Sequence, residues 1–371
     1  MPEGPDIAAA TFYASFLFDV SDTIDLTKLG SIAGESAQPA PLRFRAAPSA
    51  EHIQFAVPPL AAKLPSVTLG GVSAEARAKV YDYGVVSIRF AFPYSGTWSG
   101  FIDLIIALRT DDRLIGDARR LLDEILRDSA PALVEPHDTL VEDYFTSAVE
   151  RLATPLDAAM LLDQHGPAVL GLMLAEHQPL SPEEQAETLR LRFSYLPDDL
   201  VVLQWDAAFI CDSRENAEVI LDLLEFANSQ LVEFRTYDAR LDAELDAIYS
   251  TDLPPRRKWR PLRRFEADER AEALGYLLVD IRELADRASN ALKIVGDAYY
   301  ARIYRAVASR LGLDVWQRQI ESKLDSVGEV YRYLIDRAAT ARSEFLELIV
   351  IVLIAIEIVV GILGVAVTIR H

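Results

Sequence analysis

The chain is poor in cysteine. Cys211 is its only one, so no disulfide can form within the chain. Cys211 lies in an apolar stretch, which favours a buried, inert thiol over a reactive one. With 371 residues, 51% of them hydrophobic, the chain can bury a core without covalent cross-links. A reducing compartment suits this composition.

The chain also has fewer basic than acidic residues. The chain has 37 Lys and Arg against 57 Asp and Glu, a formal net charge of -20. Because affinity for phosphate backbones comes from Lys and Arg, we expect no general binding to nucleic acid. Lysine is much rarer than arginine, a composition that hints at a GC-rich bacterial genome.

The sequence lacks a targeting signal at its start. The first residues, MPEGPD, contain no basic group, and the apolar run from Phe12 to Val20 is short and is followed by acidic residues. This pattern matches neither a secretory signal nor an organellar transit peptide. We therefore expect the chain to stay on the side of the membrane where it is made.

Common catalytic motifs are missing as well. Five histidines occur, without the spacing of a metal site, and there is no phosphate-binding loop, dinucleotide-binding turn or nucleophile elbow. We therefore predict no cofactor, no metal site and no catalytic residues. An enzyme of an unrecognised class would need a pocket that gathers polar groups from distant segments.

The chain does have one long apolar run, LIVIVLIAIEIVVGILGVAVTI, from Leu348 to Ile369. A helix of 22 residues spans about 30 Å, the thickness of a bilayer core. Arg332, Arg337 and Arg342 precede the run and only Arg370 follows it, which predicts a cytoplasmic globular part. We therefore expect a single-pass, tail-anchored protein of the cell (inner) membrane.

One ionisable residue, Glu357, interrupts this run. A charged carboxylate at the centre of a bilayer costs about 3 kcal/mol or more, so Glu357 should be neutral, paired or inside a bundle. It is either an ion or proton site, as in a transport or channel component, or a neutral carboxyl that hydrogen-bonds between the anchors of a homo-oligomer. The pattern favours the second interpretation.

Residues 1–212 contain some stretches with the periodicity of strands and others with the periodicity of helices. This mixture predicts an α+β globular domain. The stretches Phe12–Val20, Lys79–Phe92 and Leu200–Ile210 have the composition of strands, the last one central in its sheet. Helices are predicted for Phe101–Arg127 and Leu156–Glu176, and loops around the prolines between Pro41 and Pro59.

Residues 213–346 predict a helical stalk. A long helix begins after Ser213 and continues through Ile248, a second begins near Phe265, and a third follows a turn at Leu311–Leu313 and leads into the apolar run. The second and third helices should form an antiparallel, coiled-coil-like hairpin. Residues 347–371 would then be the transmembrane anchor.

A basic segment with a central tryptophan lies between the first two helices, and the hairpin would bring it near the membrane. It either contacts anionic headgroups or is a solvated loop paired with acidic residues. Its residues are Arg256, Arg257, Lys258, Trp259, Arg260, Arg263 and Arg264.

A second candidate site is a polar cluster on the first helix. Side chains three and four apart on a helix, such as Glu233 and Tyr237, often pair for stability alone, and this structural interpretation is favoured here. The cluster consists of Asn228, Gln230, Glu233, Arg235, Tyr237 and Asp238.

The stretch YDYGVV (Tyr81 to Val86), followed by the predicted hairpin and LELIVIVLIAIEIVV (Leu346 to Val360), resembles the family named for "required for meiotic nuclear division", a domain of unknown function. The similarity runs from about Lys79 to Leu363, and Glu347 and Glu357 match its two acidic positions around the anchor. The resemblance implies membrane association and homo-oligomers, and no catalytic residues. One branch supports translation in mitochondria, whereas the missing targeting peptide here implies a bacterial-type member.

Together these patterns predict a membrane-tethered oligomeric scaffold or interaction protein with a cytoplasmic head and no established catalysis. Its expected partners are membrane lipid, further copies of itself and an unknown protein. A transport or channel component that uses Glu357, and an enzyme of unrecognised class, are the alternatives.

Overall fold

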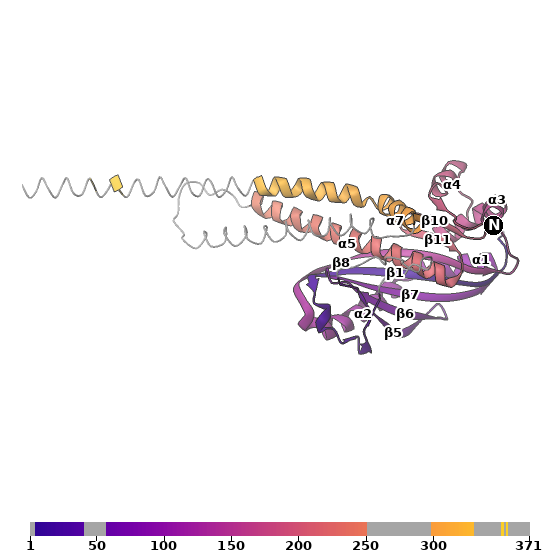
Figure 1. The fold of residues 1–371 in the computed structure, drawn as a ribbon, viewed down its shortest axis with the longest axis horizontal. Helices are drawn as coiled ribbons and strands as arrows, with labels where there is room; N and C mark the ends of the chain where they lie inside the picture. Colours follow the sequence, from indigo (N-terminus) through magenta and orange to yellow (C-terminus); the bar gives the residue numbers. More distant parts are fainter. Residues whose placement is uncertain (1–3, 41–56, 251–297, 330–349, 352–353, 355–371) are drawn as a thin grey trace, which may run out of the picture. The chain divides into compact units, whose positions relative to one another are not determined.

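The computed structural model describes residues 4–40, 57–250, 298–329, 350–351 and 354 (Figure 1). Among these, residues 4–40, 57–239 and 298–318 form one compact unit, and residues from 240 to 250 and from 319 onward belong to a second. The sheet and the start of the longest helix lie in the first unit.

The first unit is built on a large, mostly antiparallel sheet in which β8 and β11 pair in parallel. A small second sheet pairs β2 (Ser31–Ile32) with β3 (Glu35–Ser36). In spatial order, the nine described strands of the large sheet are β4 (Gln38–Pro39), β5 (Leu60–Leu69), β6 (Val72–Val80), β7 (Val85–Gly96), β1 (Ile7–Ile24), β8 (Leu133–Leu152), β11 (Ala207–Cys211), β10 (Leu200–Leu203) and β9 (Arg192–Phe193).

The two faces of this sheet differ because side chains alternate along each strand. Phe12 and Phe16 of β1, with Phe90 and Phe92 of β7, point to one face and form its aromatic core, where the rings of Phe12 and Phe92 lie 6.4 Å apart. The intervening residues, such as Tyr13 and Arg89, point to the other face. Helix α2 covers the first face and helix α5 crosses the second (Figure 1).

The helices on the core face are α1 (Trp98–Arg109), α2 (Asp112–Ser129) and α3 (Ala158–Leu174), followed by the short α4 (Pro182–Thr188). The prediction of one helix over Phe101–Arg127 was wrong, because Asp111 caps a new helix: its carboxylate accepts from the backbone N–H of Arg113. The indole N–H of Trp98 donates to the Ala168 carbonyl at 2.8 Å and joins α1 to α3.

Two of the predicted strands are hairpins. Residues 79–92 contain the end of β6, a turn at residues 81–84 and most of β7, and residues 200–210 contain β10, a turn and most of β11. The prediction of single strands was wrong because both turns contain aromatic residues, Tyr81 and Tyr83 in one and Trp205 in the other, and read as strand sequence. Strand β8, which pairs with β1 along most of its length, was not predicted from the sequence.

The predicted long helix is present as α5 (Arg214–Ser250). The Ser213 hydroxyl accepts from the backbone N–H of Asn216 at 3.4 Å, as expected for a residue that precedes a helix. Helix α7 (Ala298–Arg310) packs in the first unit, and the predicted turn follows it: Gly312 has φ +68° and the next helix covers residues 313–329. The predicted second helix, from about Phe265 to Val295, lies outside the described residues, and the hairpin stays a prediction.

Within the part of the chain that the structure describes, no helix has both the length and the apolar character needed to span a bilayer. The predicted span, 348–369, falls outside that part except for Val350, Ile351 and Ile354. Glu357 and the basic segment with Trp259 also lie outside the described residues.

The turn between β6 and β7 needs a glycine. Gly84 has φ +92°, and a Cβ atom there would lie 1.7 Å from the carbonyl oxygen of Ser21. The Gly84 carbonyl accepts from the backbone N–H of Val20 at 3.1 Å, and the Asp82 carbonyl accepts from that of Ile24 at 2.8 Å. The turn is therefore fastened to β1 by its backbone, which leaves no room for a side chain.

We expect Gly84→Ala to lower the free energy of unfolding by about 3 kcal/mol or more, since only a backbone shift relieves the overlap. Gly71→Ala is the matched control, because Gly71 has φ +79° and a Cβ atom there would meet nothing within 4 Å. This variant should lose only about 1–2 kcal/mol, the cost of the backbone strain alone. Urea unfolding followed by tryptophan fluorescence measures both, and equal losses would contradict the close approach.

Candidate functional site

The second face of the sheet carries a row of cations. Strand pairing places Lys63 of β5 opposite Arg77 of β6, and Arg77 opposite Arg89 of β7. Lys79 lies two residues along β6 on the same face. Like charges on neighbouring strands repel each other, so this face needs acidic partners.

Helix α5 supplies these partners. Glu218, Asp222 and Glu225 are four and three residues apart and therefore share one face of the helix. The Lys79 ammonium lies 2.7 Å from Glu225 Oε2 and 2.9 Å from Asp222 Oδ1. The Arg89 guanidinium lies 2.9 Å from Glu218, 3.6 Å from Asp222 and 3.7 Å from Glu225.

The centre of this network is sealed from water. Lys79, Arg89 and Glu225 are each exposed by 5% or less. Burial alone would raise the pKa of the Glu225 carboxyl, but the charges of Lys79 and Arg89 outweigh it and lower that pKa to about 2. Glu225 is therefore ionised throughout the physiological range and acts as a fixed negative charge.

The β6–β7 turn extends the contact with α5. The hydroxyl groups of Tyr83 and Ser229 are 2.7 Å apart and both are buried. The rings of Tyr81 and Tyr83 lie 5.1 Å apart. The YDYG stretch therefore binds α5 one helical turn beyond the ion network.

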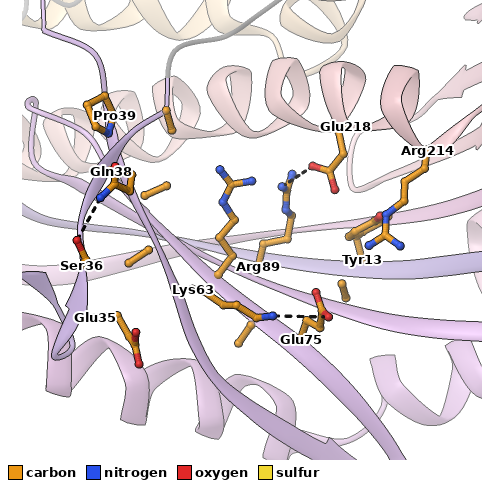
Figure 2. Close-up of a pocket in the computed structure, with 16 residues that line it drawn as sticks. Tyr13, Glu35, Ser36, Gln38, Pro39, Lys63, Glu75, Arg89, Arg214 and Glu218 are labelled. Atoms are coloured by element: carbon orange, nitrogen blue, oxygen red, sulfur yellow. Dashed lines mark hydrogen bonds and ion pairs between the residues drawn. The ribbon is translucent and has the colours of Figure 1, made fainter.

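A pocket of about 480 Å³ adjoins the network where α5 begins (Figure 2). Strands β3 to β7 form most of its wall, and Arg214 and Glu218 of α5 lie on the helix side (Figure 2). The lining residues are Tyr13, Glu35, Ser36, Gln38, Pro39, Ala40, Ala61, Ala62, Lys63, Glu75, Ala76, Arg77, Arg89, Ala91, Arg214 and Glu218.

The polar cluster predicted on the first helix lies further along α5 and is spread around it. The Asn228 amide donates to the Leu224 carbonyl at 2.8 Å, and the Gln230 side chain accepts from the Tyr304 hydroxyl of α7 at 2.5 Å. The Tyr237 hydroxyl donates to Glu233 at 3.4 Å, the pair that the helical spacing predicts.

The two remaining members of that cluster face other surroundings. Arg235 is half-exposed and forms an ion pair with Glu142 of β8, while Asp238 is partly buried near the end of the first unit. The cluster thus joins α5 to β8 and α7 through separate contacts and does not gather around a common cavity.

Neither the ion network nor the pocket was predicted from the sequence. The available signals were Lys79, which ends the alternating charged positions of β6, Arg89, the one cation of the apolar strand β7, and the acidic residues of α5 at helical spacing. Nothing in the sequence says which strand faces which helix, so these charges could not be paired. Among the described residues, no group of three His, Cys, Asp or Glu side chains is placed to hold a metal ion.

Comparison with known proteins decides the family. Residues 9–218, more than half of the chain, match the family described as the N-terminal domain of the uncharacterized protein MJ0711. The chain belongs to this family. All the residues that line the pocket fall within the matched MJ0711 N-terminal domain, while Asp222 and Glu225 follow it directly.

MJ0711 itself, from the archaeon Methanocaldococcus jannaschii, is 25% identical over 195 residues, which cover 52% of this chain and 59% of MJ0711. The chain thus spans less than two thirds of that curated relative. No solved structure matches the chain. The comparisons support a domain of unknown function, and leave both the resemblance to the family named for "required for meiotic nuclear division" and the bacterial origin as predictions.

We expect Lys79→Met to lower the free energy of unfolding by about 3–5 kcal/mol, because it leaves Glu225 buried without its nearest cation. The double variant Lys79→Met/Glu225→Leu should lose less, since the unpaired charge is gone. Lys63→Met is the control: Lys63 and Glu75 are exposed and 3.8 Å apart, a pair that contributes about 0.5 kcal/mol or less. A double variant less stable than Lys79→Met would contradict this account.

The network also predicts that the protein loses stability at acid pH. Because folding lowers the pKa of Glu225 from its ordinary 4.5 to about 2, its contribution is complete above pH 4.5 and is lost as the pH falls towards 2. The stability difference between the wild type and Glu225→Gln should therefore shrink over that interval. Urea midpoints measured at several pH values test this, and a constant difference would contradict it.

Proposed function

We propose that this chain is a non-enzymatic interaction protein, tethered to the cell (inner) membrane by a single C-terminal helix, with its globular part on the cytoplasmic side. The main support is the start of the apolar run. Val350, Ile351 and Ile354 are helical, and each side chain is 50% or more exposed. Apolar side chains grouped in this way are normally covered by a membrane or a partner.

The chemistry of the head agrees with an interaction role. The acidic residues of the ion network are held by Lys79 and Arg89, and Glu225 keeps its charge across the physiological pH range. A general acid or base needs a pKa near the working pH and access to substrate. This network instead fixes α5 to the sheet, so that the head presents a constant surface.

Two finer features belong to the same proposal. The anchors would assemble into a homo-oligomer around neutral Glu357, and the basic segment with Trp259 would contact anionic headgroups. Membrane association and homo-oligomers are also what the resemblance to the family named for "required for meiotic nuclear division" implies.

The test compares the full chain with a chain that ends at Glu344. We expect the full chain in the membrane fraction after a high-salt wash, released only by detergent, and the shortened chain in the soluble fraction. The full chain that carries Ile354→Arg and Val359→Arg should also become soluble. Each charge adds about 3 kcal/mol to the free energy of membrane insertion at the bilayer centre. Glu357→Gln is the matched control that keeps the anchor apolar.

Light scattering in detergent tests the oligomer. A defined oligomer that dissociates in the shortened chain supports assembly through the anchors. A full chain that stays soluble, or a shortened chain that stays in membranes after the salt wash, would overturn the tether.

A further inference from the structure

Two arginines that line the pocket have no partner among the described residues. Arg77 lies between Lys63 and Arg89 in the cross-strand row, and it is exposed. Arg214, the first residue of α5, is exposed at the opposite wall. Unlike Arg89, neither forms a hydrogen bond or an ion pair within the described part of the chain. In a chain with a net charge of -20, two free cations at one cavity are unexpected.

The acidic residues of the pocket do not neutralise them. Glu75 is 3.8 Å from Lys63, and Glu218 is 2.9 Å from Arg89. Glu35 lies across the pocket from Arg214 (Figure 2). Arg77 and Arg214 therefore leave the pocket with positive charge.

A hydrogen-bond donor on the sheet also lines the pocket. Tyr13 lines the pocket and is 2% exposed, and its hydroxyl forms no hydrogen bond within the described residues. Burial raises the pKa of Tyr13 to about 12, so the phenol keeps its proton at neutral pH. Its ring lies 5.7 Å from the Arg89 guanidinium. The Tyr13 hydroxyl is therefore a neutral hydrogen-bond donor that a ligand in the pocket can engage.

We propose that this pocket binds a small phosphate-bearing ligand, held by Arg77, Arg214 and the Tyr13 hydroxyl. Guanidinium groups bind phosphate oxygens through paired hydrogen bonds, and a phosphate monoester carries a charge of about −1.5 to −2 at pH 7. The site is independent of the membrane tether and lies wholly within the MJ0711 N-terminal domain.

The dimensions suit a ligand larger than a free phosphate. A volume of about 480 Å³ is within the usual range for small-molecule sites. Ala61 and Ala91 occupy positions on the same face as Lys79 and Tyr13, and their small side chains leave the space open. Most of the other lining residues are polar, which favours a hydrophilic molecule over an apolar one.

Titration calorimetry of the full chain in a neutral detergent tests the site with pyrophosphate as the probe. We expect one binding site per chain, with an affinity that falls as salt is added. Arg77→Gln/Arg214→Gln should weaken binding at least tenfold, and Tyr13→Phe should weaken it severalfold. Arg119→Gln/Arg151→Gln, which removes the same charge from exposed positions on α2 and β8, should leave the affinity unchanged.

Two further measurements complete the test. Ala91→Leu fills the space without changing charge, and it should also abolish binding. A second titration, with a soluble short-chain phosphoinositide, identifies the source of the phosphate: preference for this lipid assigns a headgroup, and preference for pyrophosphate assigns a free metabolite. Binding of neither probe, or binding that survives both Arg77→Gln/Arg214→Gln and Ala91→Leu, would overturn the proposal.

Discussion

The contact between the charged face of the sheet and α5 depends on one interaction, the buried ion network of Lys79 and Arg89 with three acidic residues of the helix. Two cations on adjacent strands cannot be covered by an apolar helix without a large desolvation cost. Glu218, Asp222 and Glu225 remove that cost only if α5 lies at one rotation and one position along its axis. The network therefore selects the placement of the helix as much as it stabilises it.

This arrangement explains why the two sheet faces differ in kind. The face with Phe12, Phe16 and Phe90 is covered by amphipathic helices and gains its stability from apolar burial. The opposite face is polar, and its ion pairs with α5 form only at one orientation of the helix. Where α5 begins, Glu218 is paired with Arg89, and Arg77 and Arg214 line an open pocket with no acidic partner among the described residues. The network and the pocket are thus the paired and unpaired parts of the same charged face.

The sequence predicted some elements well and others poorly, for identifiable reasons. Helix α5 and the turn at Gly312 were confirmed because the apolar spacing and the capping serine are local signals. Strand β8 was missed because its first half is half-exposed and polar, and it gains its partners from β1 more than a hundred residues away. The hairpins at Tyr81–Gly84 and around Trp205 were missed because tertiary contacts, rather than turn residues alone, define them.

By itself, the sequence determined the acidic character of the chain, the start of its long helix, the mixture of strands and helices in the first half, and the apolar run near its end. These properties follow from composition and from spacing over a few turns. Only the tertiary structure decided that Lys79 and Arg89 face Glu218, Asp222 and Glu225, and that Tyr13, Arg77 and Arg214 surround one cavity. Charges are paired by distances in space, and those distances depend on strand order and register, which no short stretch of sequence encodes.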